Sequence, residues 1–162
     1  MDEENFNVFV YGTLKCNFPN HYLMKDHNGK VSKYITSGKT SDKFPLVVAS
    51  FCQIPFILNS PGIGNHVQGE VWTVNTKMLQ FLDEFEAHPQ LYTRTPIKIL
   101  LNDNLDSGET MLVCGCYMLN NFKDELLKND FLVSYEVAQS SAYNGEYDNS
   151  DAEEELIKSV KK

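Results

Sequence analysis

Short stretches in which apolar residues alternate with polar ones, or run together, recur along most of the chain. They are separated by turns rich in Gly, Pro, Asn and Asp, which is the pattern of β-strands in a small sheet. The strands predicted in this way cover residues 8–11, 31–40, 46–50, 51–58, 67–74, 92–101 and 110–119. Pro55 cannot donate a ladder hydrogen bond, so we expect the strand over 51–58 to lie at a sheet edge or to be interrupted.

One segment has helical spacing instead. Its apolar residues are Met78, Leu79, Leu82 and Phe85. Asn75 precedes them and is a good N-cap, while Pro89 cannot continue a helix. We therefore predict a helix from Asn75 that ends near Ala87 or His88.

The remaining pattern is simple. Shorter helices are predicted over residues 19–25 and 122–129, and the chain beyond Phe131 reads as irregular. A chain of 162 residues is the length of one domain, and we find no internal repeat and no linker. Six or so short strands with few helices predict an α+β fold built on a small, mostly antiparallel, barrel-like sheet.

Charge changes this picture at the C-terminal end. The formal net charge is −8, and residues 146–155 hold six acidic residues and no basic one, so the rest of the chain carries only −2. A nearly neutral body lacks the basic face of a nucleic-acid binder. The acidic run predicts a solvated tail, so we place the domain at 1–147 and expect the tail, 148–162, to lie outside the core.

Neither a membrane span nor a metal site is expected. No run approaches the roughly 18 apolar residues of a span, and the acidic N-terminus lacks the features of a signal peptide, which favours a cytoplasmic protein. Of the four cysteines, Cys114 and Cys116 lie one residue apart on a predicted strand and so share a face. This differs from the Cys-x-x-Cys spacing of zinc sites, and buried free thiols are the better interpretation. No cofactor is predicted.

The first strand stops abruptly at Gly12. Glycine allows a sharp turn, and it allows a ligand to approach with no Cβ in the way. A ligand at this strand end would meet the backbone N–H groups of Gly12, Thr13 and Leu14, a row of donors suited to a carboxylate or a developing oxyanion. By itself the segment could equally be a strand-to-loop turn that binds nothing.

Seven short blocks in order give the chain a family resemblance. They are Tyr11-Gly12-Thr13-Leu14-Lys15, Pro19-Asn20-His21, Phe44-Pro45-Leu46-Val47, Ile54-Pro55-Phe56, Pro61-Gly62-Ile63-Gly64, Gly69-Glu70-Val71-Trp72 and Leu82-Asp83-Glu84-Phe85-Glu86. With them the chain resembles the γ-glutamylcyclotransferase-like (AIG2-like) family, and within it the γ-glutamylamine cyclotransferases, closely over residues 7–94. The resemblance implies a compact β-barrel with helices packed outside it. Asn17 replaces a glycine usual in the family, and asparagine tolerates the left-handed conformation that such a turn needs.

The resemblance also implies the site. The glutamate that closes the family's Leu-Asp-x-x-Glu pattern is the catalytic acid and base, and it corresponds to Glu86. Tyr11, Gly12, Thr13 and Leu14 correspond to the substrate-binding loop. On the helix alone these acids could instead be an ordinary solvated face, with Glu84 pointing away from Asp83 and Glu86. His21 is interpreted as structural.

The implied reaction asks little of a protein. In a γ-glutamylamine such as γ-glutamyl-ε-lysine, the α-amine attacks the side-chain carbonyl and releases 5-oxoproline and a free amine. The site must hold the folded-back substrate and move protons, and a glutamate in this role needs a raised pKa, which burial can supply. Phe85, Leu82 and Tyr11 are expected to line such a pocket. Two alternatives stay open: a non-catalytic binding module with this fold, and a cyclotransferase that acts on other γ-glutamyl peptides.

Overall fold

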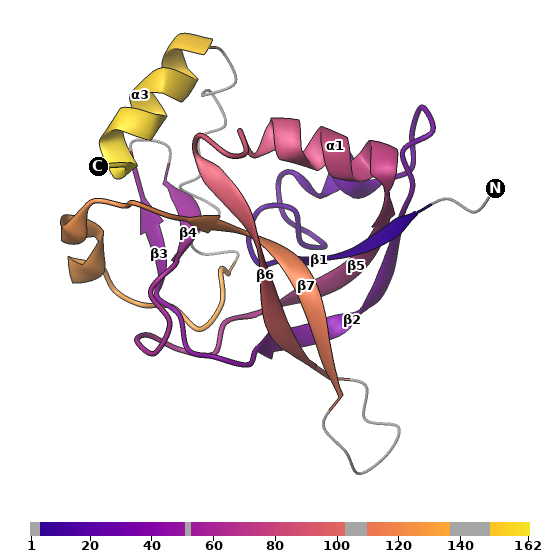
Figure 1. The fold of residues 1–162 in the computed structure, drawn as a ribbon, viewed down its shortest axis with the longest axis horizontal. Helices are drawn as coiled ribbons and strands as arrows, with labels where there is room; N and C mark the ends of the chain where they lie inside the picture. Colours follow the sequence, from indigo (N-terminus) through magenta and orange to yellow (C-terminus); the bar gives the residue numbers. More distant parts are fainter. Residues whose placement is uncertain (1–3, 51–52, 103–109, 137–149) are drawn as a thin grey trace.

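A closed barrel of five strands forms the centre of the computed structural model, which describes residues 4–50, 53–102, 110–136 and 150–162 (Figure 1). In order around the barrel the strands are β1 (Asn5–Val10), β5 (Gln68–Asn75), β2 (Ser32–Thr40), β6 (Tyr92–Leu101) and β7 (Met111–Leu119). Neighbours in this order pair antiparallel, and the ring closes where β7 meets β1. The predicted small, mostly antiparallel barrel is confirmed.

The closing pair is parallel and short. It joins Val8 to Gly115 and Phe9 to Cys116. Two further strands, β4 (Ile54–Leu58) and β3 (Leu46–Ala49), extend from β7 beside this closure. The end of β1 therefore lies near both β7 and β4, which are far from it in the sequence.

The expectation for Pro55 is wrong. Strand β4 is continuous from Ile54 and lies between β7 and β3 rather than at an edge. It pairs with β7 only through Ile57 and Leu58, whereas Pro55 pairs on one side alone, opposite Val48 of β3. The missing N–H of Pro55 therefore costs no ladder hydrogen bond on the β7 side.

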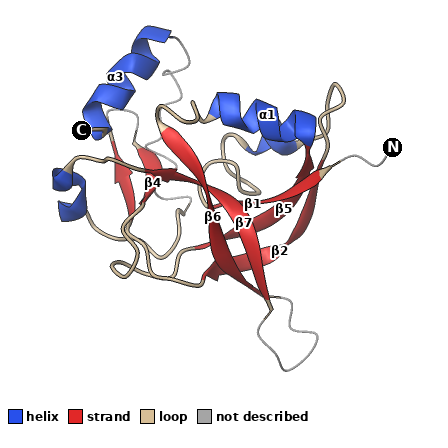
Figure 2. Cartoon of the chain, viewed as in Figure 1, coloured by secondary structure: helices blue, strands red, loops and turns tan. Residues whose placement is uncertain are grey.

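Two groups of buried side chains fill the molecule. One gathers residues from four barrel strands, including Phe9, Val71, Ile99 and Met118. The other joins the opposite side of β1 and β5 to the helix α1 (Thr76–Phe85), which lies across the outside of the barrel (Figure 2). Cys114 and Cys116 are buried and free, as predicted, and Cys52 lies outside the described residues.

Helix α1 starts where the sequence predicts and ends slightly earlier. The Asn75 side chain accepts the backbone N–H of Met78 at 3.0 Å, which confirms it as N-cap. The helix stops at Phe85, with Glu86 as its C-cap, rather than at Ala87 or His88. The reason is the backbone of Ala87, whose φ of 51° is left-handed and turns the chain away.

The shorter helices are 3₁₀ turns of His21–Met24 and Asp124–Lys128, within the ranges predicted. Asn17 adopts a φ of 71°, so asparagine does keep the left-handed turn. No helix in the described ranges is both long enough and apolar enough to cross a membrane.

The expectation that the acidic tail lies outside the core is wrong for its last part. Residues Ser150–Val160 form the helix α3, which Figure 1 shows beside β3 and β4. Its exposed face carries Glu153, Glu154 and Glu155, while Leu156 and Val160 are fully buried in the same apolar group as α1. Leu156 and Val160 are four residues apart and so lie on one face of the helix, a short apolar stripe that the acidic composition obscured. The boundary placed at residue 147 lies outside the described residues.

Helix α3 should therefore contribute to stability. Replacing Leu156 by Ala should lower the free energy of unfolding by about 2–5 kcal/mol, because it leaves a cavity in the core. The control is Glu154→Ala on the exposed face, which should stay within about 0.5 kcal/mol. Urea denaturation of both variants measures the difference, and a Leu156→Ala variant as stable as the control would show that α3 does not pack on the barrel.

Candidate active site

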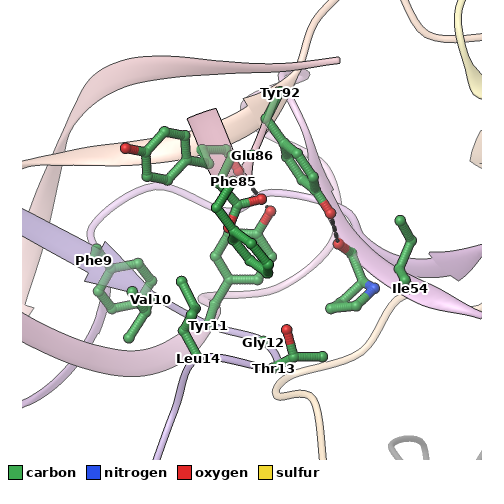
Figure 3. A pocket seen from close by; sticks show the side chains of 12 residues that line it. Phe9, Val10, Tyr11, Gly12, Thr13, Leu14, Ile54, Phe85, Glu86 and Tyr92 are labelled. Carbon is green, nitrogen blue, oxygen red and sulfur yellow. Dashed lines mark hydrogen bonds between the residues drawn. The ribbon is translucent and has the colours of Figure 1, made fainter. Parts of the chain in front are cut away.

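A pocket opens where the end of β1, the end of α1 and strand β4 meet. Its empty volume is about 450 Å³, the opening to solvent included. It is lined by Phe9, Val10, Tyr11, Gly12, Thr13, Leu14, Ile54, Pro55, Phe85, Glu86, Tyr92 and Tyr117. Figure 3 shows Glu86 and Phe85 reaching in from one side, with Gly12, Thr13 and Leu14 on the opposite side.

All five residues predicted for the site line this one pocket. Glu86 comes from the helix end, and Tyr11, Gly12, Thr13 and Leu14 come from the loop that follows β1. Phe85 also lines it as expected, but Leu82 does not, since it is fully buried in the core under α1. The sequence did not reveal Ile54, Pro55, Tyr92 or Tyr117, which come from strands that only the barrel brings here.

Gly12 also permits a close approach to β4 that the sequence did not predict. A Cβ on Gly12 would lie 2.6 Å from Cγ of Pro55, closer than real contacts allow. The glycine thus lets the loop pack directly against β4. Its φ is not in the left-handed region, so the backbone conformation itself does not require glycine.

The loop after β1 has its carbonyl groups bound and its N–H groups open. The carbonyl of Gly12 accepts the N–H of Lys15 at 3.1 Å, and that of Thr13 accepts the N–H of Asn20 at 2.9 Å. Within the described residues, no hydrogen bond uses the backbone N–H of Gly12, Thr13 or Leu14. Because the two ends of a peptide group point in opposite directions, binding the carbonyls on one side turns the N–H groups to the other.

Two residues of the Pro19-Asn20-His21 block hold this loop in place. Asn20 donates its side-chain amide to the Thr13 hydroxyl at 2.9 Å, in addition to its backbone contact. His21 bonds through Nδ1 to the carbonyl of Leu14, also at 2.9 Å, and its ring contacts Trp72. These contacts agree with the structural interpretation of His21, and they give it a definite role in shaping the loop.

The hydroxyl groups of two pocket tyrosines are already committed. Tyr11 donates to the carbonyl of Tyr117 at 2.6 Å and accepts the N–H of Ile57 at 3.1 Å. Tyr92 donates to the carbonyl of Pro55 at 2.8 Å, as the dashed line in Figure 3 marks. Burial raises the pKa of Tyr11 well above its usual value, so it stays neutral. Tyr11 therefore lines the pocket with its hydroxyl already bound.

Glu86 is the unusual group of the pocket. It is half-buried, and no hydrogen bond within the described part of the chain involves its carboxyl group. Burial raises the pKa of the Glu86 carboxyl from its ordinary 4.5 to about 8. A carboxyl in this condition can both accept and release a proton near neutral pH. Glu84 is exposed and lies outside the pocket, as predicted.

The pocket brings together a carboxyl that can exchange a proton and a loop whose backbone N–H groups are open within the described residues. No group of three or more His, Cys, Asp or Glu residues among those described could hold a metal ion. The open N–H groups can take a carboxylate or an oxyanion, and Glu86 can move a proton beside them.

Comparisons with known proteins agree on one family. A family model described as "Gamma-glutamyl cyclotransferase, AIG2-like" matches residues 8–137. Gamma-glutamylaminecyclotransferase C of Danio rerio is 40% identical over 131 residues, which cover 80% of this chain and 86% of the relative. The human gamma-glutamylaminecyclotransferase is 40% identical over 124 residues, 73% of this chain and 81% of that protein. A crystal structure of a mouse AIG2-like protein matches with a TM-score of 0.75 at 36% identity, over 82% of this chain and 89% of that one.

The raised pKa of Glu86 predicts a gain in stability for Glu86→Gln. Between pH 4.5 and about 8 the folded carboxyl keeps a proton that the unfolded chain releases, so the stability of the natural protein falls as pH rises through this window. Glutamine removes that loss. Its gain in free energy of unfolding should reach at most about 5 kcal/mol at about pH 8.5, from about 1.4 kcal/mol per pKa unit, and should vanish near pH 4. Urea denaturation at both pH values measures it, and an equal gain at both would contradict the burial of an ionisable carboxyl.

Proposed function

Because the chain belongs to the AIG2-like gamma-glutamyl cyclotransferase family, we propose that it is a γ-glutamylamine cyclotransferase, an enzyme that converts γ-glutamylamines to 5-oxoproline and a free amine. The names of its relatives from Danio rerio and Homo sapiens support the reaction. The observation that carries it in this chain is the Glu86 carboxyl, half-buried and unbonded within the described residues, facing the open N–H groups of the loop after β1.

The reaction needs one bond made and one broken. The α-amine of the substrate attacks its own side-chain carbonyl, and a C–N bond closes the five-membered ring. The C–N bond to the leaving amine then breaks. Because the attack is intramolecular, no nucleophile from the protein is required, and the pocket contributes by holding the folded-back conformer.

Glu86 is the proton carrier in this proposal. It takes a proton from the attacking amine and delivers it to the departing amine, so the carboxyl ends in the state in which it began. A carboxyl with a pKa of about 8 is a stronger base than an ordinary glutamate, so taking a proton from the attacking amine costs it less free energy. A glutamate with its ordinary pKa would be too weak a base for this step.

The loop after β1 is the substrate-binding loop. The N–H groups of Gly12, Thr13 and Leu14 supply donors for the substrate's negative charge, whether carboxylate or developing oxyanion. The ring of Tyr11 provides the adjoining wall. A binding module without turnover would have no use for a carboxyl whose burial costs stability, and this favours the enzyme over the module.

Glu86→Gln should abolish turnover. Glutamine keeps the size of the side chain but cannot carry a proton, and the loss of both acid and base roles should lower kcat by roughly 10⁴-fold. Affinity for 5-oxoproline, measured by calorimetry, should stay about the same. The matched control is Glu84→Gln on the exposed side of the helix, which should be nearly silent. If Glu86→Gln keeps its activity and Glu84→Gln loses it, the assignment of the catalytic carboxylate to Glu86 is wrong.

The apolar walls of the pocket favour a leaving amine that carries no charge next to the scissile bond. Ile54, Pro55 and Phe85 line the pocket, so a charge next to the scissile nitrogen would be poorly solvated there. In γ-glutamyl-ε-lysine the charges of the leaving amine lie beyond four methylene groups that can follow apolar surface. We expect kcat/KM to be much higher for this isodipeptide than for glutathione. The sharpest control is γ-glutamyl-α-lysine, which has the same atoms but a carboxylate beside the scissile bond. A higher kcat/KM for glutathione or for the α-linked isomer would contradict the assignment to γ-glutamylamines.

A further inference from the structure

Asp83 lies one turn before Glu86 on α1 and is bound to two strands of the barrel. Its carboxylate accepts Nε of Arg94 at 2.9 Å and Nη2 of Arg94 at 3.1 Å, both from β6. It also accepts the hydroxyl of Tyr117 on β7, at 2.7 Å. These three residues are called the Asp83 cluster below. The cluster fastens the last turn of α1 to two neighbouring strands at once.

The backbone around the cluster is tied in the same way. The N–H of His88 donates to the carbonyl of Asp83 at 2.9 Å, and the N–H of Arg94 donates to Nδ1 of His88 at 3.0 Å. The stem of Arg94 lies over Gly115, where a Cβ would approach Cγ and Cδ of Arg94 to 3.2 Å. The residues between α1 and β6 thus have little freedom to move.

The charges of the cluster are stable across neutral pH. Burial alone would raise the pKa of Asp83, but the hydrogen bonds from Arg94 and Tyr117 outweigh it and hold that pKa below its usual value. Burial and the bond to Asp83 raise the pKa of the Tyr117 hydroxyl. Asp83 therefore stays ionised and Tyr117 stays a neutral donor.

The position of the Glu86 carboxyl depends on these contacts. Its carboxyl makes no hydrogen bond within the described residues, so its place in the pocket is set by where the backbone carries it. That backbone is the end of α1, directly after the turn that the Asp83 cluster binds. Tyr117 is part of both structures, since its ring lines the pocket and its hydroxyl binds Asp83.

We propose that Asp83 is a positioning residue for the reaction, because its bonds to Arg94 and Tyr117 fix the end of helix α1, and Glu86 with it, against the wall of the pocket. The proposal rests on the proposed function, in which Glu86 carries the proton. Neither Asp83 nor Arg94 lines the pocket, so they act through Glu86 and Tyr117 rather than on the substrate.

The groups around Glu86 carry little net charge in the natural enzyme. The groups that interact electrostatically with Glu86 from the facing strands are Tyr11, Cys116 and Tyr117, and burial raises the pKa of each, so all three are neutral. On the helix side lie Glu84, which is exposed, and His88. Asp83 and Arg94 cancel each other as a pair. Removing one partner leaves the other's charge uncancelled, and Asp83 lies one helical turn from Glu86.

The first test is Tyr117→Phe. It keeps the ring in the pocket wall and removes only the hydroxyl, so it leaves no cavity. If the tie positions Glu86, kcat should fall by roughly 10–100-fold with KM changed by no more than a few-fold, because a small misplacement of a catalytic group is costly. The double variant with Asp83→Ala should lose no more than the larger single loss, since the two residues act as a unit. All variants are assayed below their melting temperatures.

The second test changes the charge of the cluster and measures the pH dependence of kcat/KM. Opposite shifts in opposite charge variants would not arise if the cluster only stabilised the fold. The acid limb of kcat/KM against pH reports the ionisation of Glu86 in the free enzyme. Asp83→Asn leaves the Arg94 cation uncancelled and should move that limb to lower pH, by about 0.3–1 unit. Arg94→Gln leaves the Asp83 anion and should move it to higher pH by a similar amount. Arg94→Lys keeps the charge and should leave the limb where it is while kcat falls. His88 is present in every variant, so it does not account for differences between them.

The control is Asp124→Asn, which removes the carboxylate of the exposed pair between Lys162 and Asp124 and should match the natural enzyme. Opposite shifts of the acid limb, with reduced kcat in Tyr117→Phe, support the positioning role. Unchanged kcat and an unchanged limb in all the cluster variants, with Glu86→Gln inactive, would overturn it and leave the proposed function intact. An active Glu86→Gln would overturn the proposed function and the positioning role together.

Discussion

The short parallel pairing of β1 with β7 is the contact on which the site depends. It joins only Val8 to Gly115 and Phe9 to Cys116, yet it closes the barrel and fixes where β1 ends. One step beyond it, the Tyr11 hydroxyl reaches the carbonyl of Tyr117, and the loop that follows packs against Pro55 of β4. A register shifted by one residue would turn Tyr11 to the other face and carry the loop amides away from Glu86.

Burial of Glu86 is the second constraint, and it opposes stability. A carboxyl without hydrogen-bond partners among the described residues, at a pKa of about 8, makes the fold less stable at neutral pH than a neutral side chain would. Groups of this kind are typical of active sites, where the environment is arranged for a proton transfer rather than for folding. The rest of the structure tolerates it because the helix carrying it is capped by Asn75, buried along one face and bound to the barrel through Asp83.

Much of the local structure could be read from the chain. Residues 67–74 and 92–101 have the pattern of strands, and the residues after Asn75 have the spacing of a helix. These patterns predict the elements because period and capping are local properties of the sequence. The tail shows the limit of such reading. Its acids suggested a solvated segment, whereas Leu156 and Val160 bury a stripe against the core that charge counting does not register.

By itself the sequence determined the barrel strands and the helix α1, and resemblance to a family pointed to Glu86 and the loop from Tyr11 to Leu14 as candidate site residues. The tertiary structure decided what these residues can do. The pKa of Glu86 is raised because burial removes water from its carboxyl, and the loop carbonyls are bound by residues that the fold brings back to them, such as Asn20. Tyr92 and Tyr117 enter the pocket, and Asp83 finds its partners, only because β6 and β7 pass beside the end of α1. Contacts between residues far apart in the chain follow from barrel closure, which no local pattern encodes.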